Sequence, residues 1–346
     1  MGLKEELIEN LSQTPYACSK LEQVAGGMMN FTFRGQLVDA LFDGSKTVII
    51  KHGEDYGSEA ADIFIPTSRC VVEQDMLRRL ESACFQPLLC RGISVRSPRF
   101  YDFNPQTTTQ IMEDVANSER LFDMTKQMDH SIATEIGEAL GKWLGCFHDW
   151  ASKQDDPGLL KTLEPNHAVQ EAIHRGMDQQ IRARGYDPAV TELTKELLTG
   201  EDGAGRGVIY GDITTKNVLY QTAENGGHTR LSVIDWEACR IGFRMQDIGV
   251  FAMINLIQYH LEGCQAALPM VHGFTSGYGP VADELVFQAA VFSGLYLLHW
   301  DMAITWTPTP DQVDGLVKIA DELIIMGAQK DRQSIKKTFL GGLLRS

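Results

Sequence analysis

Apolar residues recur at two different spacings along the first 112 residues, which predicts helices and strands mixed in one small lobe. Leu3, Leu7 and Leu11 are spaced as on one face of a helix, and a second helical stripe runs from Val72 to Leu80. Runs rich in β-branched or aromatic residues are typical of strands. Such runs lie at 21–24, 31–33, 47–50, 98–103 and 110–112. Five strands with an interposed helix predict a small α+β lobe.

Helical spacing dominates after residue 118. The clearest helix is predicted over 132–150, and the pattern beyond 246 is helical throughout. Short apolar runs at 207–210 and 231–234 indicate two more strands, and the Glu-Asn-Gly-Gly of 224–227 is typical of a hairpin turn. We therefore expect an α+β chain in two lobes. Their expected bounds are 1–112 for the first lobe, 113–117 for a hinge and 118–346 for a larger, mainly helical lobe.

Composition narrows the class of protein. The 31 Lys and Arg residues against 46 Asp and Glu residues leave a net charge of −15, and such an acidic surface repels nucleic acid. The most apolar stretch, 286–300, is too short to span a bilayer, and the charged start is no secretory signal. The seven cysteines are scattered without a Cys-x-x-Cys pair, as in a reducing compartment. We expect a cytoplasmic protein that binds neither nucleic acid nor membrane; the composition does not indicate its oligomeric state.

The strongest chemical signal is an ordered set of oxygen-bearing side chains. Residues 210–217 read Tyr-Gly-Asp-Ile-Thr-Thr-Lys-Asn, and the later apolar run ends at Asp235. Phosphoryl transfer from a nucleotide needs a carboxylate beside the attacking hydroxyl and hard oxygen ligands for Mg²⁺. Asp212 suits the first role, and Asn217 and Asp235 suit the second. Each residue alone also fits a turn or a strand end, but the ordered set indicates a phosphotransfer site.

A lysine and a glutamate in the first lobe give a second signal. Lys51 ends the apolar run 48–50, and Glu73 lies at the edge of the buried stripe of the following helix. A carboxylate there can hold the lysine ammonium on nucleotide phosphates. Glu81, two turns further along the same face, is the rival partner. Alternatively, the lysine is exposed and the glutamate is solvated.

A glycine pair precedes the second strand of the first lobe. Gly26 and Gly27, followed by Asn30, allow backbone N–H groups to approach a triphosphate closely. A Gly-Gly turn is also common without a ligand, so this motif alone does not indicate a nucleotide site.

These motifs, in this order over nearly the whole chain, resemble the aminoglycoside phosphotransferase and choline kinase family. The members are small-molecule kinases with a protein-kinase-like fold. The glycine pair with Asn30 is similar to the family's nucleotide loop, and Lys51 to its phosphate-binding lysine. Glu113 and Val115 fall in a segment similar to the hinge. Among subgroups, the motifs are similar to those of methylthioribose kinases and fungal hydroxytryptamine kinases. The resemblance implies ATP, Mg²⁺ and a small-molecule alcohol as acceptor.

Three features qualify this resemblance. Tyr210 stands where the family often has His, at a position that is usually structural. The later helices lack the paired arginines that methylthioribose kinases use on their substrate. Only eleven residues separate Asp235 from Asp247, which leaves no room for the activation loop of a protein kinase. A small acceptor is therefore expected.

The residues that would bind the acceptor are the ones that the sequence defines least well. Trp300 and Asp301, with Trp306, could line a pocket for an amine through cation–π attraction and charge pairing, or could be core tryptophans beside a solvated carboxylate. Glu237 could serve a second metal ion or the acceptor. Residues 211–217 are similar to the family's catalytic loop. Asp247 is expected to hold this loop in shape, and His148 to be packed rather than catalytic.

The predicted reaction is transfer of the γ-phosphate of ATP to a hydroxyl group of a neutral or amine-bearing small molecule. Asp212 would deprotonate the hydroxyl, Asn217 and Asp235 would hold Mg²⁺, and Lys51, steadied by Glu73, would neutralise phosphate charge. Two alternatives remain open: a non-catalytic nucleotide-binding module of the same fold, and a transferase that moves a nucleotidyl group to protein.

Overall fold

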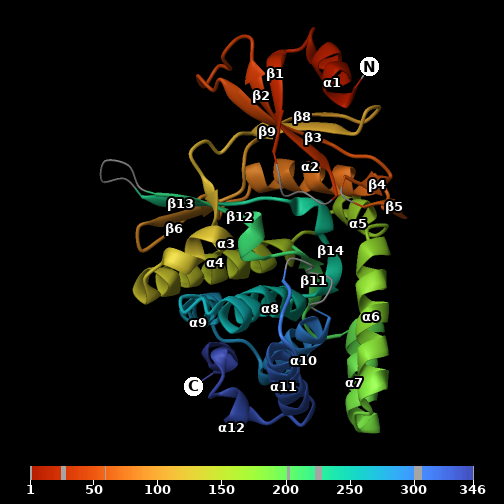
Figure 1. The fold of residues 1–346 in the computed structure, drawn as a ribbon, viewed down its shortest axis with the longest axis vertical. Helices are drawn as coiled ribbons and strands as arrows, with labels where there is room; N and C mark the ends of the chain where they lie inside the picture. Colours follow the sequence, from red (N-terminus) through yellow and green to blue (C-terminus); the bar gives the residue numbers. More distant parts are fainter. Residues whose placement is uncertain are drawn as a thin grey trace. The chain divides into compact units, whose positions relative to one another are not determined.

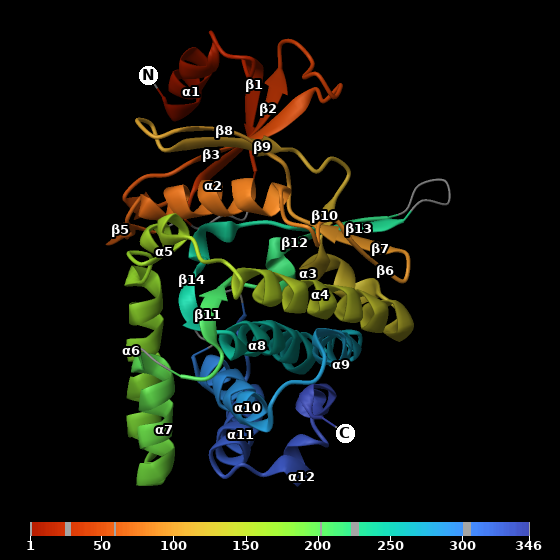
Figure 2. The ribbon, with the colours of Figure 1, turned by 180° about the vertical axis from the view of Figure 1, so that it is seen from behind.

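The computed structural model describes residues 2–24, 29–58, 60–200, 203–222, 228–299 and 306–345. The chain forms two compact units, one from Met1–Ala83 with Ser97–Asn117 and the other from Cys84–Arg96 with Ser118–Ser346. Figures 1 and 2 show the order of the elements from opposite sides. The mixture of helices and strands confirms the expected α+β class.

The first unit is built on an antiparallel five-stranded sheet in the order β1-β2-β3-β9-β8. Leu7 and Leu11 of helix α1 (Leu3–Leu11) join Phe33 and Ile50 of the sheet in one hydrophobic core. This core follows from the alternation along the strands, which turns every second residue to the same face. The strands are β1 (Cys18–Gln23), β2 (Phe31–Leu37), β3 (Thr47–His52), β8 (Phe100–Asn104) and β9 (Thr109–Glu113). All five were predicted, with ends that differ by a few residues.

Helix α2 (Ser68–Glu81) carries the predicted apolar stripe of the first unit. Its residues Val72, Met76 and Leu80 are fully buried, and so is Glu73 on the same face. A small antiparallel pair, β4 (Tyr56–Gly57) and β5 (Ala60–Phe64), precedes the helix and was not predicted. The buried glutamate is the feature of this helix that bears on function.

The second unit has its own five-stranded sheet, in the order β10-β12-β13-β7-β6. Strand β7 pairs in parallel with β13, so that Ile93 lies opposite Thr229 and Arg96 opposite Ser232. Residues 84–96 therefore belong to this unit, which nothing in their pattern indicated. The strands are β6 (Leu88–Cys90), β7 (Ile93–Arg96), β10 (Glu119–Arg120), β12 (Val218–Gln221) and β13 (Thr229–Val233). A separate ribbon pairs β11 (Arg206–Ile209) with β14 (Arg240–Phe243).

Helix α4 (His130–Ala151), predicted over 132–150, packs on the β6–β7 side of the sheet and on helix α9 (Ala267–Tyr278). The two helices approach closely because glycines line the contact. A Cβ atom at Gly137 would lie 2.1 Å from the Met270 carbonyl oxygen, and one at Gly141 would lie 1.9 Å from that of Phe274. Further helices that the structure describes after residue 118 include α3 (Leu121–Met124), η1 (Thr125–Gln127), α8 (Met245–Glu262), α10 (Asp283–Leu298), α11 (Pro310–Ala328), α12 (Arg332–Ile335) and η5 (Phe339–Leu343).

Helices α5 (Pro157–Leu163), α6 (Ala168–Arg184) and α7 (Pro188–Thr199) form one edge of the second unit (Figures 1 and 2). The side chains of Asp156 and Asp187 cap the first and last of these helices by accepting hydrogen bonds from backbone N–H groups. In each case a proline follows at the first helical position, where a missing N–H costs nothing. Helix α6 contacts α10, and α7 contacts α11.

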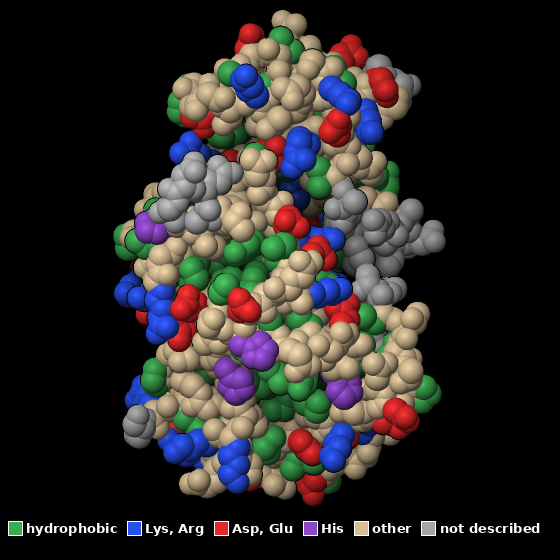
Figure 3. Space-filling model, turned by 60° about the vertical axis from the view of Figure 1, so that its left-hand side comes forward, with side chains coloured by type: hydrophobic (Ala, Val, Ile, Leu, Met, Phe, Trp, Pro, Cys, Tyr) green, Lys and Arg blue, Asp and Glu red, His purple; other side chains and the backbone are tan. Residues whose placement is uncertain are grey.

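Acidic and basic side chains are interspersed over the face drawn in Figure 3. In the described part of the chain, no helix has both the length and the apolar character to cross a membrane. The apolar helix α10 is instead packed between α8 and α11.

Candidate active site

The loop between β11 and β12 carries the predicted base, Asp212. Gly211 has a φ of +90°, and a Cβ atom there would lie 2.3 Å from the Ala238 carbonyl oxygen, so the chain needs glycine at this point. The Asp212 carboxylate then accepts a hydrogen bond of 2.7 Å from the side-chain amide of Asn217, which also donates to the Asp212 carbonyl at 3.0 Å. The predicted base and one predicted metal ligand are thus in direct contact.

The electrostatic environment of Asp212 favours its protonated form. Burial and the nearby negative charge of Asp235 raise the pKa of the Asp212 carboxyl to about 7. The hydrogen bond from Asn217 and the positive charges of Arg240 and Lys216 act in the opposite direction. A carboxyl with a pKa near neutrality can both take up and release a proton under ordinary conditions.

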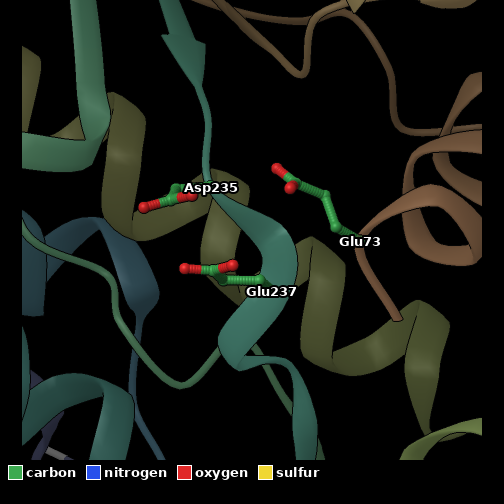
Figure 4. Close-up of side chains that lie close together, drawn as sticks. All are labelled: Glu73, Asp235 and Glu237. Carbon is green, nitrogen blue, oxygen red and sulfur yellow. The ribbon is translucent and has the colours of Figure 1, made fainter. Parts of the chain in front are cut away.

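Asp235 and Glu237 follow strand β13 and form an acidic pair. Asp235 adopts the left-handed conformation, with a φ of +66°, at the start of the short helix η3 (Trp236–Ala238). Oxygen atoms of the two carboxylates lie within 4.8 Å of each other (Figure 4). The Ile234 N–H donates to the Asn217 carbonyl at 3.0 Å, which ties this segment to the catalytic loop. These carboxylates and the Asn217 amide offer the hard oxygen donors that suit Mg²⁺.

Asp247, at the start of helix α8, anchors the predicted catalytic loop. Its two carboxylate oxygens accept hydrogen bonds from the backbone N–H groups of Tyr210 at 2.9 Å and Gly211 at 2.8 Å. His148 of helix α4 contacts the same carboxylate through Nε2 at 3.0 Å, and its Nδ1 lies 2.9 Å from the Tyr278 hydroxyl. All three of these side chains lie within the second unit. The contacts agree with the expected structural role of Asp247 and the packed role of His148.

Tyr210, at the position where the family often has His, links two parts of the site. Its hydroxyl donates to the Ile234 carbonyl, and its ring meets the Trp236 ring edge-on at 4.7 Å between centroids. The side chain is fully buried. Tyr210 therefore holds the catalytic loop against the segment that carries Asp235.

Sequence reasoning missed two residues that shape this segment. The Asn166 side-chain amide donates to the carbonyls of Glu237 at 2.7 Å and Cys239 at 2.9 Å. The guanidinium of the buried Arg240 donates to the Ala238 carbonyl at 3.1 Å and to the Gln246 side chain at 3.1 Å. No motif indicates these contacts, because their acceptors are mostly backbone carbonyls.

In the first unit, Lys51 and Glu73 form the ion pair that their positions suggested. The Lys51 Nζ atom lies 2.8 Å from both carboxylate oxygens of Glu73, and the Gln110 side-chain amide donates to one of these oxygens at 3.0 Å. The rival carboxylate, Glu81, instead accepts a hydrogen bond of 2.7 Å from the Phe100 N–H. The lysine is therefore held by Glu73.

Only part of the predicted nucleotide loop lies among the described residues. Gly26 and Gly27 lie outside the described residues. Asn30 is buried, and its side-chain oxygen accepts a hydrogen bond of 3.0 Å from Arg69. Arg69 also donates to the carbonyls of Met29 at 2.9 Å and Glu54 at 3.0 Å. Asn30 therefore helps to fix the chain that follows the glycines.

The segment similar to a hinge follows strand β9. The Glu113 carboxylate accepts a hydrogen bond of 3.0 Å from the Arg99 N–H, and Val115 is buried. Between them, the Asp114 carboxylate binds the Arg34 guanidinium at 2.8 and 3.1 Å. The nucleotide contacts predicted for Glu113 and Val115 stay predictions.

Two residues predicted for the acceptor, Trp300 and Asp301, lie outside the described residues. Trp306 is described and packs against Phe122, with 6.0 Å between the ring centroids. Its indole N–H donates to the Glu262 carboxylate at 2.8 Å. Beside these two rings lies Lys216 of the catalytic loop.

Comparison with known proteins finds similarity to phosphotransferases over most of the chain. A model described as the phosphotransferase enzyme family matches residues 111–282. Phosphotransferase FrzJ from Cladobotryum is 28% identical, with 97% of this chain and 94% of that protein aligned. 4-hydroxytryptamine kinase from Psilocybe cyanescens is 24% identical, with 88% and 86% aligned. The resemblance to the aminoglycoside phosphotransferase and choline kinase family is confirmed. The family match indicates phosphotransferase activity.

Solved structures of other proteins share the fold of this chain. A choline/ethanolamine kinase family protein from Mesorhizobium loti superposes with a TM-score of 0.53 at 12% identity, covering 95% of this chain and 99% of that one. The gentamicin-APH(2")-IIa complex gives 0.52 at 12% identity and covers both chains fully. At these identities the likeness concerns the fold, which is the protein-kinase-like fold expected from the resemblance.

Proposed function

We propose that this protein transfers the γ-phosphate of ATP to a hydroxyl group of a small molecule. The observation that carries the proposal is the contact between Asp212 and Asn217 in a loop anchored by Asp247. The pKa of the Asp212 carboxyl, raised to about 7, suits a general base that works near neutral pH. The phosphotransferase family match supports the same reaction class.

In this proposal, Asn217 and Asp235 hold Mg²⁺, and Glu237 is close enough to Asp235 to serve the same ion or a second one. The donor set fits the ion, since Mg²⁺ prefers carboxylate and amide oxygens. Bound there, Mg²⁺ would neutralise charge on the phosphates. The backbone contact from Ile234 to Asn217 keeps the two ligand-bearing segments in register for this task.

Lys51 is proposed to bind nucleotide phosphates. Lys51 is about 9% exposed, and its ammonium is oriented by Glu73, which is itself held by Gln110. A lysine whose direction is fixed in this way loses little conformational freedom when it meets a phosphate. Gly26, Gly27, Asn30, Glu113 and Val115 complete the proposed nucleotide contacts.

The proposed phosphoryl transfer forms one bond to phosphorus and breaks another. The acceptor hydroxyl oxygen forms a bond to the γ-phosphorus, while the bond from that phosphorus to the bridging oxygen of ADP breaks. The hydroxyl proton passes to the Asp212 carboxylate, which later releases it to solvent. The products are ADP and a phosphate monoester of the acceptor.

The acceptor is proposed to be a small-molecule alcohol. One relative is named for its action on 4-hydroxytryptamine, which is an amine-bearing hydroxyl compound. The sequence-based preference for a neutral or amine-bearing alcohol depended on the net charge of −15 and on an excess of carboxylates, Asp212, Asp235 and Glu237 with Asp301 nearby, and it stays a prediction.

The test compares wild type with Asp212→Asn, using the exposed Asp149→Asn as a control. We expect Asp212→Asn to lower Mg²⁺-dependent turnover, measured as ADP release with a panel of hydroxyl compounds, by roughly 10²-fold or more. Its affinity for ATP should stay within a few-fold of wild type. Equal turnover in the two variants would overturn the assignment of the base.

The same assay separates the alternatives. A non-catalytic module would bind ATP and release no ADP in excess of a blank. A nucleotidyl transferase would leave AMP on a product, which mass spectrometry distinguishes from a phosphate. Turnover that survives EDTA would contradict the proposed metal site.

A further inference from the structure

Lys216 lies within the catalytic loop, between Asp212 and Asn217, and has a contact pattern that the proposed reaction does not explain. Its ammonium sits 5.2 Å from the centre of the Phe122 ring and 5.0 Å from that of Trp306. The two rings pack on each other, so the cation is held by two aromatic faces from separate elements. The side chain is half-buried.

The neighbouring charges are paired with one another. Lys126, which lies over the same Phe122 ring at 5.8 Å, forms an ion pair of 3.1 Å with Glu262. Arg120 pairs with Asp123 at 3.0 Å. Within the described ranges, Lys216 alone in this group has neither a hydrogen bond nor an ion pair. Its three N–H donors therefore have no hydrogen-bond acceptor among the oxygen atoms of the described residues.

An ammonium in this state favours an oxygen-bearing ligand. A half-buried charge gains stability from hydrogen bonds that replace lost water, and anionic or carbonyl oxygens accept the strongest of these. The aromatic faces are already occupied by the lysine, so an ammonium on a ligand would meet repulsion there instead of cation–π attraction. Lys216 also lies near enough to Asp212 for their opposite charges to attract.

We propose that Lys216 is a specificity-determining residue that binds an oxygen-bearing group of the acceptor beside the reacting hydroxyl. The acceptor class is then a hydroxy acid or a polyol, and an amino alcohol is disfavoured. On this point the inference departs from the sequence-based prediction, which allowed an amine and disfavoured a carboxylate. Phe122 and Trp306 hold the ammonium in position. This inference rests on the proposed function, because it takes Asp212 as the base that receives the acceptor.

Three probes with one carbon skeleton test the inference: lactate, propane-1,2-diol and 1-amino-2-propanol. They differ only in the group beside the hydroxyl, which is a carboxylate, a hydroxyl or an ammonium. Binding is measured by saturation-transfer NMR on the full chain with Mg²⁺ and a non-hydrolysable ATP analogue. We expect wild type to bind lactate and the diol at least fivefold more tightly than the amino alcohol.

The variant Lys216→Met keeps the apolar stem against the rings and removes the ammonium. We expect it to lose the preference for lactate and the diol, while its affinity for the ATP analogue stays within twofold of wild type. Lys126→Met is the matched control, because that lysine lies on the same ring but is paired, and it should keep the preference. Lys216→Arg should retain part of it.

The inference is overturned if wild type prefers the amino alcohol or binds none of the three probes. It is also overturned if Lys216→Met changes the affinity for all three probes equally, because the lysine would then serve the packing. A loss of more than fivefold in affinity for the ATP analogue would overturn it too, because the lysine would then serve the nucleotide. Failure of the proposed function is seen separately, as an absence of ADP release from wild type with any hydroxyl compound.

Discussion

The side-chain amide of Asn217 donates a hydrogen bond of 2.7 Å to the Asp212 carboxylate. This contact stabilises the charged form of Asp212 and so lowers its pKa, against the effects of burial and Asp235. One residue thereby combines two tasks, because the Asn217 oxygen is the proposed metal ligand while its N–H group controls the base.

Replacing Asn217 should therefore move the pH dependence of the reaction. In Asn217→Ala the pKa of Asp212 rises above about 7, so the base is protonated at neutral pH and the acid limb of the kcat profile shifts to higher pH. Asn217→Asp should shift it further, since it adds a negative charge, but should recover turnover at high pH because it keeps an oxygen ligand. A shift to lower pH in either variant would contradict this account.

Asp212 should weaken the fold at neutral and alkaline pH when Mg²⁺ is absent. Its folded-state pKa of about 7 lies above the ordinary value of 3.8, so the stability it contributes is present below that value and is lost as pH rises through 7. Asp212→Asn should then raise the free energy of unfolding at pH 8, by at most about 4 kcal/mol. Urea titrations at pH 5 and pH 8 measure this effect. The exposed Asp149→Asn should show no such pH-dependent gain.

Removing the anchor of the catalytic loop should be costly. Asp247→Ala leaves the backbone N–H groups of Tyr210 and Gly211 and a nitrogen of His148 without their buried acceptor. We expect a loss of about 3–5 kcal/mol in the free energy of unfolding. His148→Gln should cost less, because it leaves the two backbone contacts in place. A chemical denaturation midpoint unchanged by Asp247→Ala would refute the anchoring role.

Two glutamates of helix α2, Glu73 and Glu81, allow a matched test of the ion pair with Lys51. Glu73→Gln removes the counter-charge of a buried ammonium and should weaken ATP binding about tenfold, because Lys51 is no longer oriented. Glu81→Gln should leave ATP binding unchanged, since an amide oxygen can still accept from the Phe100 N–H. Calorimetric titration with ATP measures both. Equal effects would mean that Lys51 orientation does not matter for the nucleotide.

Tyr210→Phe tests the contribution of the Tyr210 hydroxyl group alone. The variant keeps the ring against Trp236 and loses the hydrogen bond to the Ile234 carbonyl. We expect a loss of about 1 kcal/mol in the free energy of unfolding and a modest fall in kcat, with the Michaelis constant for ATP unchanged. If kcat fell as far as in Asp212→Asn, Tyr210 would have a direct part in the chemistry.

Elements with a strong local pattern were predictable from the sequence. The β-branched run before Lys51 forms β3, and the spacing of Met76 and Leu80 places Glu73 on the buried face where it meets the lysine. Asp212 and Asn217, five residues apart in a loop with a required glycine, were expected in one site and are in direct contact.

Features that depend on distant partners were not predictable. Asn166 belongs to no motif in the sequence. Its role in holding the segment after Asp235 depends on the carbonyls of Glu237 and Cys239, which only the fold brings within hydrogen-bonding distance. Lys216 belongs to the motif at 210–217, but its position between two aromatic rings depends on Trp306, which lies far along the chain. Strands β6 and β7 are too short to show a period, so their pairing could not be assigned.

The parallel pairing of β7 with β13 constrains the order in which the second unit can form. As the chain leaves the ribosome, β6 and β7 emerge early, but their neighbour in the sheet is made only after the whole of helices α4 to α7. Until then one edge of β7 has exposed backbone groups, as an unpaired strand does. Closing so long a loop is slow, so this strand pair should form late in folding. During synthesis the β6–β7 hairpin therefore keeps an unpaired edge that another strand could pair with until β13 has been made.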